Sequence, residues 1–509
     1  MAAAFAVASS GGADVYRKPP DTTNLPRLGD ASREDLSPIL ERKLGEEIMN
    51  DIRRDPDYLD DDPTLEYLNN FGSALVAAAP DARGEANLNF FFFAVRDPMI
   101  NAFALPGGFI AVHSALLIAA QNESELASVM SHEIGHVQQR HIARQLGKQR
   151  EDMLLPLASL ILAALAAKAS PDAAMGIALG GQGLAIQRQL NFSRDAEREA
   201  DRVGFQIMNS AGFDTSGMVA FFKRLQNATR LYPDPPPWLS SHPMTEERIA
   251  DIQARIRTAP HHKPRPDSLD FHIIRARARV LQDGSVKGND DNKAFFESQL
   301  TQPNRQEQIA AQYGMAFLAL KKGDLAGAQN WLDKARGALK PKPGVFSAES
   351  DGSDGAPLFA GLQLEIELAP GQSDAVVQRA VKDAAMAYQQ FPLSRAIAHQ
   401  NAEALIAAGK YEEAARFLRD QIQQYRAEPK LYDTLARTYA REGKIALQHM
   451  ALAESYALSG ALPAAMDQLG LARKAKDVSF YDQSVIDARE REIKAKQKDE
   501  KDEKKDSKF

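Results

Sequence analysis

The sequence predicts a mainly α-helical protein in two parts, the first of which also contains a small β-sheet. A His-Glu-x-x-His motif at 132–136 lies among apolar residues at helical spacing, which predicts a metal-binding helix. Short apolar runs between residues 88 and 112 predict the strands of the sheet. In the second half, small residues and glycines recur with a step of 34 residues, as between Gly409 and Gly443, which predicts paired helices.

The overall composition limits the classes of protein to consider. At 509 residues the chain is long enough for two or more domains, each with its own hydrophobic core. Its net charge of −6 is modest and gives no reason to expect binding to nucleic acid. The sequence contains no cysteine, which excludes disulfides, thiolate metal ligands and thiol catalysis.

The N-terminal region is expected to be a mobile arm followed by two helices. Residues 1–35 carry Gly, Pro, Ser and Asp without periodicity, and the first fifteen lack the basic start and long apolar centre of a secretory signal. Helices are predicted to begin near Pro38 and Pro63, because proline suits the first helical turn. The acidic residues from 55 to 62 fit no EF-hand spacing and are interpreted as a solvated loop with carboxylates at the start of the next helix.

Three strands are predicted next, at 88–95, 101–105 and 109–112. The sequence Pro106-Gly107-Gly108 between the last two predicts a hairpin. An edge strand beside a metal-binding helix can bind the backbone of an extended substrate, and these two glycines would let a peptide approach closely. An ordinary tight turn is an equally good interpretation of the spacing.

The helix predicted over 123–147 carries the candidate catalytic residues. His132 and His136 are four residues apart, so both imidazoles can reach one zinc ion. Glu133 follows the first of them and is close enough to deprotonate a zinc-bound water. His113 and His141 are further candidate ligands, but a structural role suits each of them better because the zinc ion already has its set of ligands.

A second helical segment, over 192–204, supplies the missing carboxylate. Glu197 and Asp201 are four residues apart and share a face. Glu197 would complete a site of two histidines and one glutamate whose fourth position stays open, as catalytic zinc requires. Asp201 would accept the free N–H of a zinc-bound histidine and fix its tautomer. The alternative, a solvated face of a charge-rich helix, is disfavoured by the neighbouring zinc motif.

These two motifs resemble those of the M48 family of zinc metallopeptidases, and the resemblance extends from about residue 40 to about residue 485. It implies a zincin-like metallopeptidase domain over 36–258 that binds one Zn²⁺ per chain. By the resemblance, His132, His136 and Glu197 are the zinc ligands and Glu133 is the general base. It also implies that His242, in a Ser-His-Pro motif, can occupy the open zinc position and hold the enzyme latent. From the sequence alone, a neutral imidazole in the turn before a helix is a better interpretation of His242 than a zinc ligand.

The resemblance is strongest to the repeat-containing members of the family that act in the periplasm of Gram-negative bacteria. It implies a periplasmic endopeptidase that takes part in quality control and assembly of outer-membrane β-barrel proteins. Unfolded or stalled β-barrel proteins would be the substrates, and the repeats would bind these clients or the β-barrel assembly machinery. It also favours contact of Gly107, Gly108 and Phe109 with the substrate. The alternative is a chaperone or assembly scaffold with little proteolytic activity.

Two stretches between the metal-binding helices have an unusual composition. Residues 153–167 are apolar throughout but fall short of the ~20 residues needed to cross a bilayer. We favour a buried helix or a mobile apolar flap over contact with a membrane surface. Four glycines between 176 and 183 predict a bendable segment that could act as a lid.

The second half is predicted to begin after an interdomain linker at 259–267. An irregular array of tetratricopeptide-like repeats is expected over 268–488, with a loop insertion at 341–357 and a last helix pair out of phase with the 34-residue step. A plain helical bundle is the alternative. Residues 489–509 alternate Lys with Asp and Glu, which predicts a helix end and then a disordered charged tail.

Overall fold

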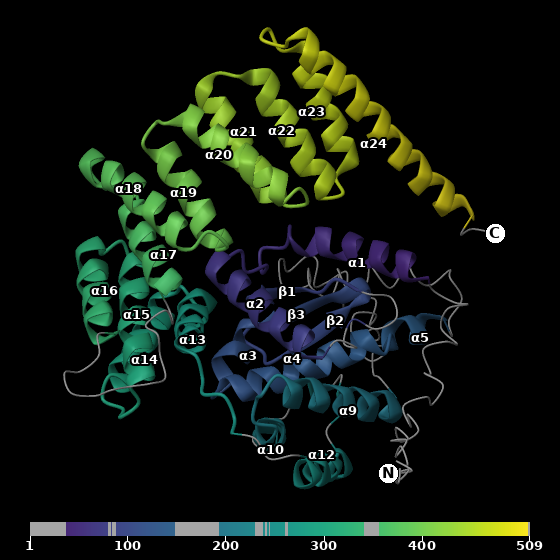
Figure 1. The fold of residues 1–509 in the computed structure, drawn as a ribbon, viewed down its shortest axis with the longest axis vertical. Helices are drawn as coiled ribbons and strands as arrows, with labels where there is room; N and C mark the ends of the chain where they lie inside the picture. The colour runs from purple at the N-terminus through teal and green to yellow at the C-terminus, as the bar shows by residue number, and fades with distance from the viewer. Residues whose placement is uncertain are drawn as a thin grey trace, which may run out of the picture.

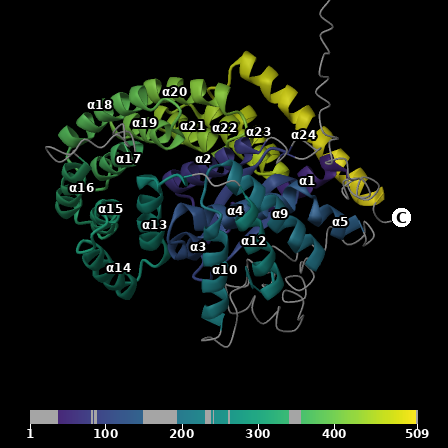
Figure 2. The same cartoon turned by 60° about the horizontal axis from the view of Figure 1, so that its bottom comes forward.

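The computed structural model describes residues 37–79, 83, 88–147, 193–229, 238–239, 242–243, 245–259, 263–339 and 356–506. The predicted N-terminal arm, the apolar stretch at 153–167, the glycines at 176–183 and nearly all of the insertion at 341–357 lie outside the described residues. The described chain forms an N-terminal part with a small sheet and an arc of helices that curves around one side of it (Figures 1 and 2).

The first two helices begin where the sequence predicts, each with a proline in its first turn. They are α1 (Pro38–Ile52) and α2 (Asp62–Ala78). The side chain of Ser37 caps α1 and that of Asp61 caps α2, each accepting a hydrogen bond from a backbone N–H three residues on. The apolar face of each helix is buried against the sheet, so the capped ends fix both helices at its border.

The sheet contains three strands, β1 (Phe91–Val95), β2 (Ala102–Leu105) and β3 (Phe109–His113), in the order β1-β3-β2. The predicted hairpin is confirmed: β2 and β3 are antiparallel and joined by a 3-10 turn, η3 (Pro106–Gly108). β1 runs parallel to β3. β3 is therefore the central strand, and β2 is an edge strand on the side of the metal-binding helix.

The glycines of this turn adopt left-handed conformations and are packed closely against neighbouring backbone. Gly107 and Gly108 have φ values of 77° and 92°. A Cβ on Gly107 would lie 2.7 Å from the Cα of Arg42, and a Cβ on Gly108 would lie 2.8 Å from the backbone oxygen of Asn89. Phe109 is buried in a strand that already has both neighbours. Both glycines thus lie against neighbouring backbone, and contact of these three residues with a substrate stays a prediction.

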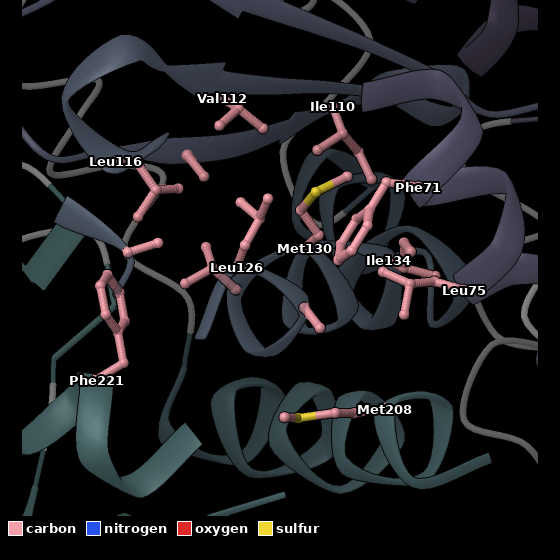
Figure 3. Close-up of a cluster of buried hydrophobic side chains, with 14 of the residues drawn as sticks. Phe71, Leu75, Ile110, Val112, Leu116, Leu126, Met130, Ile134, Met208 and Phe221 are labelled. Carbon is pink, nitrogen blue, oxygen red and sulfur yellow. The ribbon is translucent and has the colours of Figure 1, made fainter. Parts of the chain in front are cut away.

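The helix with the His-Glu-x-x-His motif, α4 (Glu123–Gln138), lies between the sheet and α9 (Arg194–Ser210), as Figure 3 shows. Met130 of α4 points toward Ile110 of β3, and Ile134 lies beside Phe71 and Leu75 of α2 (Figure 3). The apolar stripe that predicted the helix is thus the stripe that anchors it to the sheet. The opposite face of α4 meets α9 and carries the histidines.

The long helix predicted over 123–147 is broken in two. α4 ends at Gln138, and α5 (His141–Gly147) follows at a new direction. Arg140 lies between them with a φ of 52°, a left-handed conformation that is uncommon for a residue other than glycine. Its Nε donates a hydrogen bond of 3.0 Å to the carboxylate of Glu41 in α1, and both side chains are buried. This ion pair is the tertiary contact that the helical pattern did not reveal.

Shorter helices complete the N-terminal part, and a row of helix pairs follows. The N-terminal set is α3 (Ser114–Ala119), α10 (Ser216–Thr229) and α12 (Glu246–Thr258). The array comprises α13 (Leu269–Gln282), α14 (Val286–Gln299), α15 (Arg305–Lys321), α16 (Leu325–Leu339), α17 (Ala356–Glu367), α18 (Asp374–Gln390), α19 (Arg395–Ala407), α20 (Tyr411–Gln424), α21 (Pro429–Glu442), α22 (Ile445–Leu458), α23 (Leu462–Lys474) and α24 (Phe480–Asp506).

The turns within the helix pairs agree with the recurring glycines of the sequence. Gly409 and Gly443, 34 residues apart, both adopt positive φ values, of 73° and 74°. Gly323 and Gly460 do the same at 77° and 71°. A left-handed residue at this point ends the first helix of a pair without strain, which explains the glycines. The paired arrangement is consistent with repeats, and the tetratricopeptide assignment stays a prediction.

Helix α13 belongs to both parts of the molecule, so the structure places no clean boundary at residue 268. One face adds Phe271, Ile274 and Ala278 to the core of the N-terminal part. The other face adds Leu269, Ile273, Ala276 and Val280 to the first core of the helix array. A helix whose two faces are buried in different cores couples the positions of those cores.

A buried arginine strengthens this junction. Arg277 of α13 binds the carboxylate of Asp61 at 2.8 Å, the hydroxyl of Tyr313 in α15 at 3.1 Å and the carboxylate of Glu365 in α17 at 2.7 Å. Burial alone would raise the pKa of Asp61, but the Arg277 guanidinium outweighs burial and holds that pKa below its usual value. The three contacts join α2 to the helix array through one side chain.

The acidic segment at the start of α2 supplies the expected helix-start carboxylates, Asp61 and Asp62, and in addition it docks on the array. Lys430 of α21 binds Asp60 at 2.9 Å and Asp62 at 2.8 Å. Nδ1 of His399 in α19 lies 2.9 Å from Asp62. Glu66 caps the start of α19 by accepting the backbone N–H of Ala396 at 2.9 Å. No spacing rule within 55–66 could reveal partners more than 300 residues away.

The C-terminal helix is longer than predicted. α24 continues to Asp506 through most of the stretch 489–509 that the sequence predicts as a disordered tail. Opposite charges three or four residues apart, such as Arg489 with Glu492 and Lys494 with Glu490, support an exposed helix. None of the helices in the described part of the chain has the length and apolar character needed to span a membrane.

Replacing Arg277 by leucine tests whether its ion pairs hold the two parts together. The change leaves Asp61 and Glu365 without their cation, so we expect the free energy of unfolding to fall by about 3–5 kcal/mol. Urea denaturation followed by circular dichroism measures the loss. In the control Arg437→Leu, which removes an exposed pair with Glu403, the loss should stay below about 1 kcal/mol. Equal losses in the two variants would contradict the assigned role.

Candidate metal centre

Helix α4 presents two imidazoles and a carboxylate on its buried face. His132, Glu133 and His136 are each at most 1% exposed. The two histidines lie one helical turn apart, and their Nε2 atoms are 3.0 Å from each other. Both rings therefore direct the same nitrogen to a common point, as the spacing of the motif predicts.

Helix α9 brings a carboxylate to the same point because two glycines let the helices touch. A Cβ on Gly135 of α4 would lie 2.9 Å from the backbone oxygen of Ala200, and a Cβ on Gly204 of α9 would lie 2.9 Å from the backbone nitrogen of His132. At this close crossing, Glu197 reaches both rings: its oxygens lie 3.5 Å from Nε2 of His132 and 3.4 Å from Nε2 of His136.

Asp201 lies behind His132, where the sequence predicts it. Its carboxylate is 3.0 Å from Nδ1 of His132, on the far side of the ring from the common point. Arg248 of α12 donates to both oxygens of Asp201 at 2.7 and 2.8 Å, and also binds Glu197 at 2.8 Å. Sequence reasoning missed Arg248, since it lies in an ordinary charged helix start and only the fold reveals its burial.

His242 is the fourth side chain at the common point. It is 2% exposed, and its Nδ1 lies 2.9 Å from Glu197 and 3.3 Å from Nε2 of His132. Its backbone N–H donates to the backbone oxygen of Trp238 at 2.8 Å. This hydrogen bond ties His242 to Trp238 beside the centre, and the role of His242 as a fourth ligand, which the family resemblance implies, stays a prediction.

Glu133 has one oxygen held and the other available. Oε1 accepts a hydrogen bond from the indole N–H of Trp238 at 3.2 Å and lies 3.5 Å from Nε2 of His242. Oε2 is buried and has no hydrogen-bond partner among the described residues. A buried carboxylate oxygen without a partner is costly, and a metal-activated water would satisfy it. Trp238 was not singled out for this contact in the sequence.

The surroundings distribute protons unevenly between the two motif histidines. Burial alone would lower the pKa of His132, but hydrogen bonds with Asp201 and Glu197 outweigh it and raise the pKa to about 9. Burial dominates at His136, whose pKa lies well below its usual value. Burial opposes ionisation of Glu197, yet His242 and the hydrogen bonds of the other two imidazoles hold its pKa well below the usual range. In the metal-free protein, His132 therefore carries the proton.

These residues fit a divalent metal ion. One ligand atom each from His132, His136, Glu197 and His242 can be chosen so that all four lie within 4.8 Å of one another. Imidazole nitrogens with one carboxylate are a donor set typical of catalytic zinc sites. The unsatisfied oxygen of Glu133 beside the group gives a second, independent indication of an ion with a water molecule.

The two other histidines considered as ligands lie outside this group. Nδ1 of His113 is 3.1 Å from the backbone oxygen of Met99, in a structural contact at the end of β3. His141, the first residue of α5, lies behind His136 rather than at the common point. Its contacts with Glu199 and Arg144 form a separate group of polar side chains.

Comparisons with known proteins agree with this centre. A family model described as peptidase family M48 matches residues 69–256. A β-barrel assembly-enhancing protease of Yersinia pestis is 31% identical over 94% of this chain and 93% of its own length. A putative protein of the same name from Vibrio cholerae is 38% identical over 60% of this chain and 62% of its own length. A mitochondrial metalloendopeptidase, OMA1, of Schizosaccharomyces pombe is 28% identical over 43% of this chain and 62% of its own length.

Proposed function

This chain belongs to peptidase family M48, and on that premise we propose that it is a zinc-dependent endopeptidase for the quality control and assembly of outer-membrane β-barrel proteins in the periplasm. The convergence of His132, His136 and Glu197 from two helices carries the proposal. The similarity to the Yersinia protein, which is named for β-barrel assembly, extends over 94% of the chain and so includes the helix array.

His132, His136 and Glu197 would hold the zinc ion through Nε2, Nε2 and a carboxylate oxygen. When bound, zinc supplies a Lewis acid that polarises a scissile carbonyl and acidifies water. Asp201 accepts the Nδ1 proton of His132 and so keeps the lone pair of Nε2 directed at the ion. Arg248 holds Asp201 and Glu197 in place and balances their charges.

Glu133 moves the proton. Its Oε1 is fixed by the Trp238 indole, so its unpartnered Oε2 is the oxygen that accepts a proton from the attacking water. The same oxygen then delivers that proton to the leaving amine of the substrate. General acid–base transfer of this kind contributes about 10²–10⁴-fold to the rate.

His242 keeps the centre latent in this proposal. Its ring already lies among the three ligands and is closed off from solvent. As a fourth ligand it would take the position that the attacking water needs, so a substrate must displace the ring before hydrolysis. The backbone hydrogen bond between His242 and Trp238 links this displacement to the indole that holds Glu133.

The free edge of β2 is a second candidate for binding an extended substrate, beside the turn at Gly107 and Gly108. Within the described chain, β2 pairs with β3 on one side only, and it packs beside α4. Backbone groups on the other side can hydrogen-bond an added strand. Unfolded or stalled β-barrel proteins would offer such strands, and the curved array of helices would hold these clients or the assembly machinery.

Replacing Glu133 by glutamine tests the proton transfer. The amide keeps the shape but cannot accept the proton, so hydrolysis of unfolded casein should fall at least ~100-fold. Zinc content, measured by mass spectrometry of the metal, should stay at one per chain. The control Glu403→Gln changes an exposed residue of the array and should keep full activity. Activity near the wild-type level in Glu133→Gln would refute the role.

Replacing His242 by alanine tests latency. If the ring blocks the water position, cleavage of unfolded casein should rise several-fold while zinc remains bound through the other three ligands. The control His449→Ala removes a histidine of the array that pairs with Gln468 and should leave the rate unchanged. A lower rate in a folded, zinc-loaded His242→Ala variant would rule out a blocking role.

Zinc binding should release a proton, because the metal and the proton compete for His132. With a His132 pKa of about 9, the metal-free site holds this proton at neutral pH, and it is lost only as the pH rises through 9. The apparent zinc affinity should therefore fall about tenfold for each unit of decrease between pH 8 and 6. Calorimetry in two buffers with different ionisation enthalpies counts the protons released. An affinity independent of pH in this range would contradict the assignment.

A further inference from the structure

A third imidazole lies directly behind the second motif histidine. Nδ1 of His136 is 2.8 Å from Nδ1 of His141. On its other side, Nε2 of His141 is 3.0 Å from Oε2 of Glu199, and Arg144 donates to the same oxygen at 2.8 Å. His141 is 3% exposed, so this row of groups is closed to solvent at the end nearest the metal centre.

The break between α4 and α5 is what brings His141 to this position. On a continuous helix, a residue five positions after His136 would point about 140° away from it. The left-handed conformation of Arg140, held by Glu41, turns the chain so that the first residue of α5 faces back toward the centre. The ion pair of Arg140 with Glu41 of α1 thus stabilises the left-handed backbone at residue 140. This backbone conformation in turn places His141 in contact with His136.

The distances allow one arrangement of protons that leaves His136 able to bind a metal ion. Nε2 of His136 faces the other ligands and must be unprotonated, so its proton lies on Nδ1. Nδ1 of His141 must then accept that proton, which places the proton of His141 on Nε2. This Nε2–H donates to the carboxylate of Glu199. In this arrangement each contact in the row from His136 through His141 to Glu199 pairs one donor with one acceptor.

The two motif histidines are therefore supported by different means from the same helix. His132 meets a carboxylate of α9 directly, at Asp201, which Arg248 holds. His136 meets a carboxylate of α9, Glu199, only through the ring of His141, and Arg144 holds that carboxylate. Because Glu197 also belongs to α9, this one helix supplies a ligand and the support for both other ligands.

We propose that His141 is a positioning residue that holds His136 in the tautomer and orientation needed to bind the metal ion, with Glu199 and Arg144 fixing His141 in turn. The inference rests on the proposed zinc centre but concerns a residue outside the ligand set. Loss of a hydrogen-bond partner of a metal-bound histidine typically weakens metal binding 10–100-fold. His141 should therefore act on zinc affinity even though it does not touch the ion.

Two substitutions of the same residue separate positioning from packing. His141→Phe keeps a planar ring but removes the acceptor, and we expect zinc to bind 10–100-fold more weakly. His141→Asn places an amide oxygen near the site of Nδ1 and should recover part of that loss. Glu199→Gln keeps shape without charge and should weaken binding in the same direction. Competition with a chromogenic chelator, using the full-length metal-free protein and ZnCl₂, measures each dissociation constant.

The matched control is His113→Phe, which changes another buried histidine of the N-terminal part that contacts Met99 rather than a ligand. It should bind zinc as the wild type does, even if its urea midpoint falls as much as that of His141→Phe. Zinc binding within twofold of the wild type in both His141→Phe and Glu199→Gln would overturn the proposal and leave the proposed function intact. Absence of zinc binding by the wild type would overturn both.

Discussion

The close contact between α4 and α9 is the constraint on which the rest of the structure depends. Gly135 and Gly204 lie at the crossing, and a methyl group at either position would be within 3 Å of the backbone of the opposite helix. Only at this separation can the carboxylates of α9 reach the imidazoles of α4. The apolar face of α4 is fixed on the sheet, so the crossing sets where the ligands meet and which residues support them.

The same crossing buries many charged groups, and the surrounding helices compensate for them. Three carboxylates of α9 face the centre or its support, and Arg248 of α12 and Arg144 of α5 are their cationic partners. Burial of ions without partners would cost several kcal/mol each, so these arginines are part of the centre. Farther from the site, Arg277 and α13 connect two hydrophobic cores. One core contains the apolar face of α4, and the other belongs to the first helix pairs of the array. The metal centre and the array are thus built on a shared framework.

The sequence predicted those features that depend on local spacing. The convergence of residues 132, 136 and 197, the position of Asp201 beside His132, the hairpin and the glycine turns of the array follow from helical periodicity or from the backbone needs of glycine. The missed features depend on distant partners: Arg140 breaks a helix because Glu41 lies opposite, and the acidic segment near Asp62 docks on Lys430. The close packing of Gly107 against Arg42 and of Gly108 against Asn89 is likewise invisible in the spacing of the sequence.

The most direct test of the metal centre is a crystal structure of the zinc-loaded protein with data collected at the zinc absorption edge. We expect one anomalous peak about 2.0–2.2 Å from Nε2 of His132, Nε2 of His136 and a carboxylate oxygen of Glu197. We also expect Nδ1 of His136 to remain within hydrogen-bond distance of His141. A zinc peak elsewhere, or a Glu197 side chain turned away from the two rings, would refute the proposed metal centre.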